Sequence, residues 1–542
     1  MVMALLLGRA FRQFGRMSRA QSCFSRRALL HVASKERTFK DAVALLATLN
    51  SNKQVVKAVS RSSKDANAFA IPEMLAYLRK AGYTPDDFNR MKFIHIAGTK
   101  GKGSTCVMIE SILLQYRNGD NRSQTNMLGK IGLYTSPHLT DVRERIRIDG
   151  KPVSEQLFAR YFFELWDRFS SSKSDADLDV QPGYFRYLTI LALHTFIGEG
   201  VETGIIECGI GGEYDSTNIL PQEAVTTTAI TSLGLDHIGM LGETIEEIAW
   251  HKAGIMKQGV TAFTVNQVPK AQVILAERVT EKGVDLGVVE ASTALEDVKL
   301  GLEGKFQREN AALAVSIAAC HLRNLGISHD VLLPRPAILK PLPGKFIKGL
   351  ELVKWPGRCQ VFADGNITWC LDGAHTTDSL REAATWFNEH MVQTQNGVNP
   401  RTATMLIFNQ TERDGAALLR DLMTALYRVN CVGVIFPRHS PAGRPAQRLG
   451  RAMFTYAAFP TNTPFMVSTG KQTVDLKAQD RLASVYQSLD GNGLHMSYAS
   501  IEEAVQLARR VSDDDEPLLV FVTGSLHLVG GVLQVLKRIK RD

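Results

Sequence analysis

The stretch that decides the fold is residues 92–105, KFIHIAGTKGKGST, where an apolar run enters a loop with three glycines in six positions. Residues 106–114 follow with the apolar pattern of a helix, so the order is strand, glycine-rich loop and helix. Glycine lets backbone N–H groups turn towards an anion, and the start of a helix adds partial positive charge. This order predicts a loop that binds nucleotide phosphates through Gly98, Thr99, Lys100, Gly101, Lys102, Gly103 and Ser104.

The spacing inside this loop is unusual. The common pattern is G-x-x-x-x-G-K-[ST], but here Gly103 separates Lys102 from Ser104. Lys102 would reach the outer phosphates, and the hydroxyl of Ser104 or Thr105 would lie near a bound Mg²⁺. The alternative is a flexible loop without a ligand, which the flanking strand and helix argue against.

Length and composition describe an ordinary globular protein. The 542 residues are 44% hydrophobic and 22% charged, which suggests two or three domains at roughly 100–200 residues each. No apolar run approaches the ~20 residues that span a bilayer. Seven cysteines without a C-x-x-C pair indicate reduced thiols and no zinc site or disulfide framework. No G-x-S-x-G motif or catalytic Cys–His arrangement is evident.

The basic charge is concentrated at the N-terminus. Residues 1–35 hold seven basic residues and no acidic one, whereas the whole chain has a net charge of only +8. The rest of the protein is therefore close to neutral, which argues against a nucleic-acid-binding surface. The Arg- and Ser-rich composition of residues 1–35 is typical of a mitochondrial transit segment, with a disordered basic tail as the alternative. A start at Met17 would drop three arginines and give a cytoplasmic form, so we expect a mitochondrial protein, a cytoplasmic protein, or both.

Strands and helices alternate along the chain twice, before and after a proline-rich stretch at residues 333–354. This pattern predicts an α/β fold with two doubly wound domains. We expect a P-loop ATPase-type domain over residues 36–345 and a smaller Rossmann-like domain over residues 346–542. Residues 141–150 alternate charged residues with Val and Ile, and predict an exposed strand that ends in an Asp-Gly turn.

Several polar residues follow predicted strands, at the sheet edge where α/β proteins bind ligands. Residues 203–212 predict a strand that runs into glycines, and Glu207 at its carboxyl end is a candidate Mg²⁺ ligand, with a buried-edge ion pair as the alternative. Asp372 and His375 follow a second strand, with Arg358 one strand earlier; a turn with a surface ion pair is the alternative there. Lys252 lies on the apolar face of a predicted helix, where a lysine either reaches past its neighbours to water or works in a site.

Taken together, these motifs resemble the Mur ligase superfamily, and within it the eukaryotic type of the folylpolyglutamate synthase family. The extra glycine of the phosphate loop is that superfamily's own variant. The matching stretches occur in the family's order and are residues 95–104 (HIAGTKGKGS), 134–139 (YTSPHL) with 144–146 (ERI), 207–212 (ECGIGG) with Asp215 and Asn218, 235–237 (LDH) with 241–242 (LG), 252–255 (KAGI), 308–312 (RENAA), 356–358 (PGR), 371–375 (LDGAH) and, more weakly, 523–526 (TGSL).

The resemblance implies a ligase that uses ATP to activate the terminal glutamate carboxylate of a reduced folate as an acyl phosphate, which the amine of L-glutamate then attacks. It implies a central ATP-binding domain, a C-terminal glutamate-ligase domain and a monomer; from charge and the length of the apolar runs we expect no nucleic-acid partner and no integral membrane segment. It also implies Mg²⁺ and leaves room for a monovalent cation such as K⁺. By similarity, Ser136 and Glu207 hold one Mg²⁺ and His237 the second; Lys102, Lys252 and His375 act in catalysis; and Asn310, Arg358 and Asp372 contact ATP.

Two points of this resemblance bear on the reaction. Lys252 matches a lysine that is carbamylated in many relatives, which would turn the cation into an anionic ligand. Thr376 follows the Asp-Gly-Ala-His motif, as in eukaryotic members, where many bacterial relatives have Asn. This favours a dedicated polyglutamylating enzyme over dihydrofolate synthase. A nucleotide-binding regulator without ligase activity remains the alternative from another class.

Overall fold

The structure is a computed structural model that describes residues 37–49, 69–117, 127–171, 181–290, 295–327, 342–397, 402–411, 413–430, 453–465, 474–490, 493–512 and 517–540. The predicted transit segment lies outside these ranges. No helix within them is both long and apolar enough to cross a membrane. The five cysteines in the same ranges are buried and free, as predicted.

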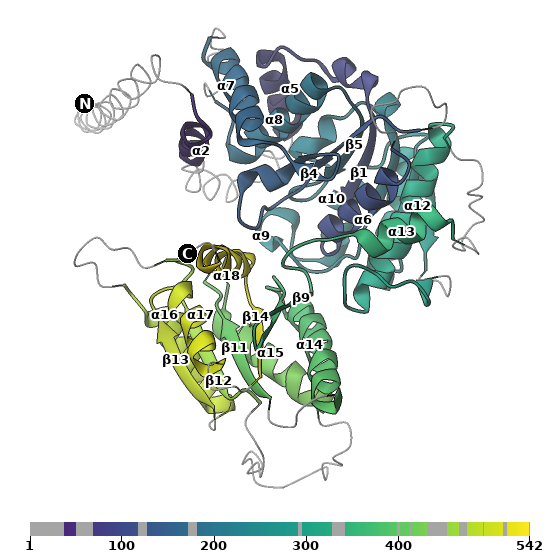
Figure 1. The fold of residues 1–542 in the computed structure, drawn as a ribbon. Helices are drawn as coiled ribbons and strands as arrows, with labels where there is room; N and C mark the ends of the chain where they lie inside the picture. The colour runs from purple at the N-terminus through teal and green to yellow at the C-terminus, as the bar shows by residue number, and fades with distance from the viewer. Residues whose placement is uncertain are drawn as a thin grey trace, which may run out of the picture.

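The first sheet has eight strands in the order β4-β3-β2-β5-β1-β6-β7-β8 (Figure 1). The two short strands at one edge, β3 and β4, pair antiparallel, and the others pair in parallel. The strands are β1 (Lys92–Ala97), β2 (Lys130–Tyr134), β3 (Ile146–Ile148), β4 (Lys151–Pro152), β5 (Val201–Glu207), β6 (Val225–Ile230), β7 (Thr261–Val265) and β8 (Asp285–Val289).

Helices cover both faces of this sheet because successive strand residues point to opposite sides. Ile94 and Ile96 of β1 pack in the core beneath α6, α12 and α13, whereas Phe93 packs on the side of α7 and α8. The helices are α2 (Phe39–Thr48), α5 (Ala70–Lys80), α6 (Lys102–Leu114), α7 (Glu155–Ser171), α8 (Tyr184–Glu199), α9 (Ile238–Leu241), α10 (Ile245–Ala253), α11 (Pro269–Lys282), α12 (Phe306–Asn324) and α13 (Gly344–Leu352).

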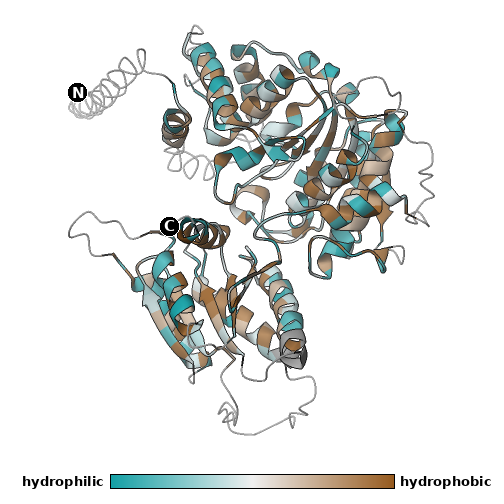
Figure 2. Ribbon diagram, in the orientation of Figure 1, coloured by the Kyte–Doolittle hydropathy of each residue, from teal (hydrophilic) through white to brown (hydrophobic). Residues whose placement is uncertain are grey.

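The second sheet has six strands in the order β13-β12-β11-β14-β10-β9, of which only β9 runs antiparallel. Helices α14 to α16 cover one face and α17 and α18 the other. Figure 2 shows mostly hydrophobic central strands between these helices. The elements are β9 (Gln360–Asp364), β10 (Ile367–Leu371), α14 (Thr377–Gly397), β11 (Ala403–Phe408), α15 (Gly415–Asn430), β12 (Tyr456–Pro460), α16 (Lys477–Leu489), β13 (Leu494–Tyr498), α17 (Ile501–Ser512), β14 (Leu518–Thr523) and α18 (Leu526–Ile539).

Two helix-covered sheets confirm the predicted fold class of two doubly wound domains. The domain boundary predicted between residues 345 and 346 stays a prediction; α13, which begins next to it, packs on α6 of the first domain.

One detail of the sequence interpretation was wrong. Residues 142–145 form a 3₁₀ turn, because the Asp141 carboxylate accepts the Arg143 N–H and so favours a turn over a strand. The strand begins only at Ile146, and Asp149 and Gly150 form the expected turn with positive φ angles.

The contact between α13 and α6 gives a stability prediction. A β-carbon on Gly349 would lie only 2.6 Å from the Cα atom of Ile112, so Gly349→Ala forces two helices apart. We expect a loss of about 1–3 kcal/mol in the free energy of unfolding, measured by urea denaturation. The matched control is Gly344→Ala in the same helix, where a β-carbon meets nothing within 4 Å. Equal stability of the two variants would contradict the prediction.

Candidate active site

The phosphate loop lies between β1 and α6, as predicted, and its glycines are structurally required. Gly98 and Gly101 have φ angles of +144° and +85°, which side chains disfavour. A β-carbon on Gly101 would collide with the Asn310 side chain of α12, and one on Gly98 would collide with Thr231. The loop is therefore packed closely against two neighbouring elements, and Asn310 lies beside it.

The end of β6 holds the loop in place. The backbone N–H groups of Thr99 and Lys100 both donate to the Ser232 carbonyl, at 3.0 and 3.1 Å. The Thr99 hydroxyl donates to the Gly234 carbonyl at 3.1 Å. The first N–H groups of α6 have no partner within their own helix, as at any helix start, so they can donate hydrogen bonds to a bound anion.

Two lysine amines converge on one carbonyl of the loop. Lys102 Nζ donates to the Gly98 oxygen at 3.1 Å, and Lys252 Nζ donates to the same oxygen at 2.8 Å. Lys252 comes from α10 and is only 3% exposed. The alternative in which Lys252 reaches past its neighbours to water is therefore wrong. Burial, reinforced by the charge of Lys102, lowers the pKa of Lys252 to about 7.

This pKa gives a second stability prediction. The pKa of Lys252 in the folded protein lies below the ordinary lysine value of 10.5, so folding disfavours proton binding between pH 7 and 10.5. Burial of the charged Lys252 lowers the free energy of unfolding by its full amount below pH 7, and this loss disappears as the pH rises towards 10.5. We therefore expect the wild type to gain about 2 kcal/mol relative to Lys252→Met between pH 7 and 9, measured by urea denaturation. Lys270→Met, at an exposed lysine, is the control; the same pH trend in both variants would refute the assignment.

The metal-ligand candidates Ser136 and Glu207 meet at the carboxyl ends of β2 and β5. Glu207 pairs in register with Ile96, two residues before the loop begins. Its Oε2 atom accepts the Ser136 N–H at 2.8 Å. Burial raises the pKa of Glu207 above its usual value, while the positive charges of Lys102 and Arg358 oppose that rise. Glu207 is thus a buried carboxylate among cations.

His237 precedes α9 in a left-handed conformation, with φ of +51°. Burial lowers its pKa, and so do the charges of Lys102 and Lys252, against the opposing charge of Asp236. These interactions place His237 on the loop side of the sheet. Within the described ranges, no three His, Cys, Asp or Glu side chains form a metal-binding group. The predicted set instead combines a carboxylate, a hydroxyl and an imidazole, and its oxygen atoms are donors that Mg²⁺ accepts.

The second domain brings Arg358, Asp372 and His375 together at the end of β10. The two carboxylate oxygens of Asp372 accept the N–H groups of Cys359 and Ala374, at 2.8 and 2.9 Å. His375 Nδ1 lies 3.0 Å from the Gly373 carbonyl, and burial lowers the pKa of His375. Asp372 is buried, so the alternative of an ordinary surface ion pair is wrong for this group.

Contacts between the domains bring in residues of the second domain that the sequence did not reveal, among them Asp378 and Arg413. Lys100 of the phosphate loop pairs with Asp378 at 3.4 Å, and Asp236, next to His237, pairs with Arg413 at 2.8 Å. The Trp355 side chain lies beside Gly103. In Figure 1 the short helix α9 and the strand β9 face the junction of the two domains. Residues of both domains therefore border the phosphate loop.

Comparison with known proteins identifies relatives that match nearly the whole chain. The chain matches no family model. It is 41% identical over 531 residues to folylpolyglutamate synthase of Candida albicans, a match that covers 92% of this chain and 96% of that protein. It is 40% identical over 525 residues to the Neurospora crassa enzyme of the same name, with 94% and 93% covered.

Solved structures support the fold. The apo form of L. casei FPGS has a TM-score of 0.64 at 21% identity and covers 92% of this chain and 100% of that one. Mycobacterium tuberculosis folylpolyglutamate synthase complexed with ADP has a TM-score of 0.63 at 21% identity, with 92% and 99% covered. With about two fifths of its residues shared with the fungal proteins over nearly their whole length, this chain belongs to the folylpolyglutamate synthase family.

Proposed function

We propose that this chain is an ATP-dependent ligase that joins L-glutamate to the terminal glutamate carboxylate of a folate. The observation that carries the proposal is the convergence of Lys102 and Lys252 on the Gly98 carbonyl, beside the buried Glu207, in a chain of this family. A lysine in such a loop reaches the outer phosphates of a bound nucleotide, which supports this role for Lys102.

The chemistry follows from the weakness of a carboxylate as an electrophile. A carboxylate oxygen of the folate attacks the γ-phosphorus of ATP, which gives an acyl phosphate and ADP. The amine of L-glutamate then attacks the acyl carbon, the bond to the phosphate oxygen breaks, and an amide and inorganic phosphate result. Lys102 offsets the negative charge on the transferring phosphoryl group, and the N–H groups at the start of α6 orient the phosphates.

The second domain would complete the site. Arg358 and Asp372 contact the nucleotide in this proposal, Asn310 contacts it from α12, and His375 lies near the incoming glutamate. Splitting these contacts over two domains favours closure, which would exclude water from the acyl phosphate.

Mg²⁺ fits the residues on the first domain. Ser136 and Glu207 would hold one ion and His237 a second, and the bound metal would neutralise charge on the phosphoryl oxygens. Lys252 has a pKa of about 7, so much of it is an unprotonated amine at neutral pH. Such an amine can add to carbon dioxide and lose a proton to form a carbamate, which supports the carbamylation expected from the family.

An acceptor assay tests the function. Purified protein is incubated with ATP, labelled L-glutamate and either tetrahydrofolate or dihydropteroate. We expect incorporation of label with tetrahydrofolate and release of one phosphate per glutamate added. Incorporation only with dihydropteroate would assign the chain to dihydrofolate synthase instead. No incorporation with either acceptor, despite ATP binding, would indicate a nucleotide-binding regulator.

We also propose that residues 1–35 direct the protein to mitochondria and that a start at Met17 leaves a cytoplasmic form. The acid-free, arginine-rich composition of this segment supports the proposal. Fluorescent fusions of the chain starting at Met1 or at Met17 test it. Cytoplasmic fluorescence from the full-length fusion would refute the import signal.

A further inference from the structure

A cavity lies at the end of the first sheet that is opposite to the phosphate loop. It measures about 470 Å³ and is bordered by Gln222, residues 256–258 and residues 280–283. These segments immediately precede β6, β7 and β8, so the cavity sits at the amino ends of three adjacent parallel strands. The phosphate loop follows the carboxyl end of β1. We call this cavity the amino-edge pocket.

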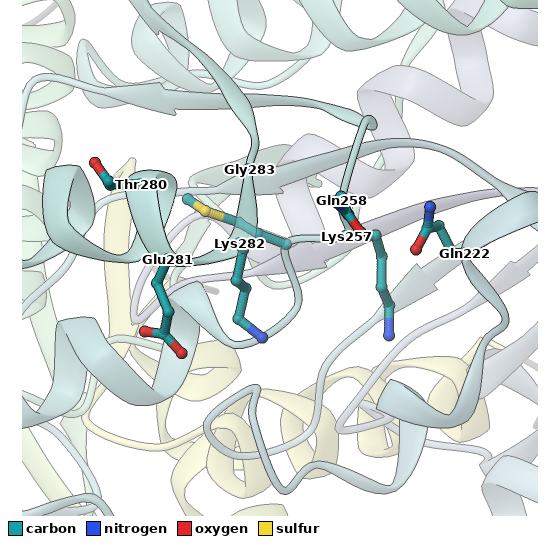
Figure 3. Close-up of a pocket in the computed structure, with 8 residues that line it drawn as sticks. Gln222, Lys257, Gln258, Thr280, Glu281, Lys282 and Gly283 are labelled. Atoms are coloured by element: carbon teal, nitrogen blue, oxygen red, sulfur yellow. The ribbon is translucent and has the colours of Figure 1, made fainter.

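Two lysine side chains reach into this pocket. Figure 3 shows the amines of Lys257 and Lys282 extended in the same direction, with Glu281 to one side and Gln222 to the other. The amide groups of Gln222 and Gln258 add polar atoms to the lining. Such a lining suits a ligand with several hydrogen-bond acceptors.

The positive charges around the pocket exceed the negative ones. Lys282 lies 3.3 Å from Glu213, but Arg278 also binds Glu213 through Nη2 and contacts both carboxylate oxygens of Glu281 through Nη1. The carboxylates of Glu213 and Glu281 are therefore already paired with Arg278 and Lys282.

The second lysine has no such partner. Among the described residues, no carboxylate lies within ion-pair distance of Lys257, which instead donates to the Oδ1 and backbone oxygens of Asn218, at 2.9 and 3.3 Å. Burial, together with the charge of Lys282, lowers the pKa of Lys257 to about 8. A half-buried ammonium group without an anion is unfavourable, and a bound anion would relieve this imbalance.

We propose that the amino-edge pocket binds a small organic anion with at least two carboxylate or phosphate groups, one on Lys257 and another on Lys282. The volume falls within the range of about 300–1,000 Å³ that is usual for small-molecule sites, and a single inorganic phosphate would not fill it. Two separate amines in one cavity favour a ligand whose charges are also separated. The site does not depend on the proposed ligase reaction.

Isothermal titration calorimetry of the full chain tests the proposal without turnover. Glutarate and glucose 1,6-bisphosphate are the probes, acetate is the single-charge comparison, and saturating ADP with Mg²⁺ keeps the probes out of the phosphate loop. We expect glutarate or the bisphosphate to bind with a submillimolar Kd and acetate not to bind. The probe with the lower Kd shows whether the pocket prefers carboxylates or phosphates.

Variants locate the binding. Lys257→Met and Lys282→Met should each weaken it by roughly tenfold or more, as expected when a charged hydrogen-bond donor is lost. Lys257→Gln retains a donor for Asn218 and should fold normally, yet should show the same loss. Lys270→Met changes an exposed lysine of the same helix α11 and should bind like the wild type. The proposal is overturned if neither probe binds at millimolar concentration, or if the Lys257 and Lys282 variants bind as well as the wild type.

Discussion

Glu207→Ala is expected to lower turnover by about three orders of magnitude, or roughly 4 kcal/mol in the activation barrier. The substitution removes the buried carboxylate proposed to hold Mg²⁺ and leaves the charges of Lys102 and Arg358 without their opposing anion. Initial rates of phosphate release with tetrahydrofolate and L-glutamate measure the effect. Glu207→Gln should be similarly impaired, because it keeps the shape of the side chain but not its charge.

The control for this experiment is Glu202→Ala, which changes an exposed glutamate of the same strand β5. It should retain the wild-type rate. Turnover of Glu207→Ala within tenfold of the wild type would remove Glu207 from the proposed metal site.

Lys102→Met is expected to lower kcat by about a thousandfold while changing the KM for ATP much less. The reason is that the lysine amine should interact most strongly with the charge that develops on the phosphoryl group during transfer. Steady-state kinetics over a range of ATP concentrations separate the two constants. A raised KM with unchanged kcat would show that Lys102 only binds the nucleotide.

Lys348→Met, at an exposed lysine of α13, serves as the matched control. It removes one lysine from a helix that packs on α6 and should leave both constants unchanged. Melting curves of the two variants would show whether a loss of activity comes from unfolding.

The parts of the site that the sequence predicted are those with local causes. The loop after β1 depends on glycines and on the adjoining helix, and these are consecutive in the chain. Glu207 and Asp372 could be placed because polar residues after buried strands reach the same edge of a parallel sheet. The helical period placed Lys252 on an apolar face, but it could not tell whether the amine turned outward or inward.

The parts that were missed depend on distant segments or on competing local bonds. Arg413 meets Asp236 across 177 residues, a pairing that depends on how the two domains dock. The 3₁₀ turn at residues 142–145 has the charge alternation of a strand, yet side-chain bonds from Asp141 and Glu144 favour the turn. Hydrophobic periodicity carries no information about either effect.

The Gly98 carbonyl has a consequence for the movement of Lys102. One oxygen accepts hydrogen bonds from two amines, so it remains satisfied if either donor leaves. In the proposed reaction, Lys102 can leave this oxygen to follow the phosphoryl group without leaving a buried acceptor unpaired, because Lys252 keeps its own bond. Lys252 therefore acts as a second donor to the Gly98 oxygen, which allows Lys102 to change partners in the proposed reaction.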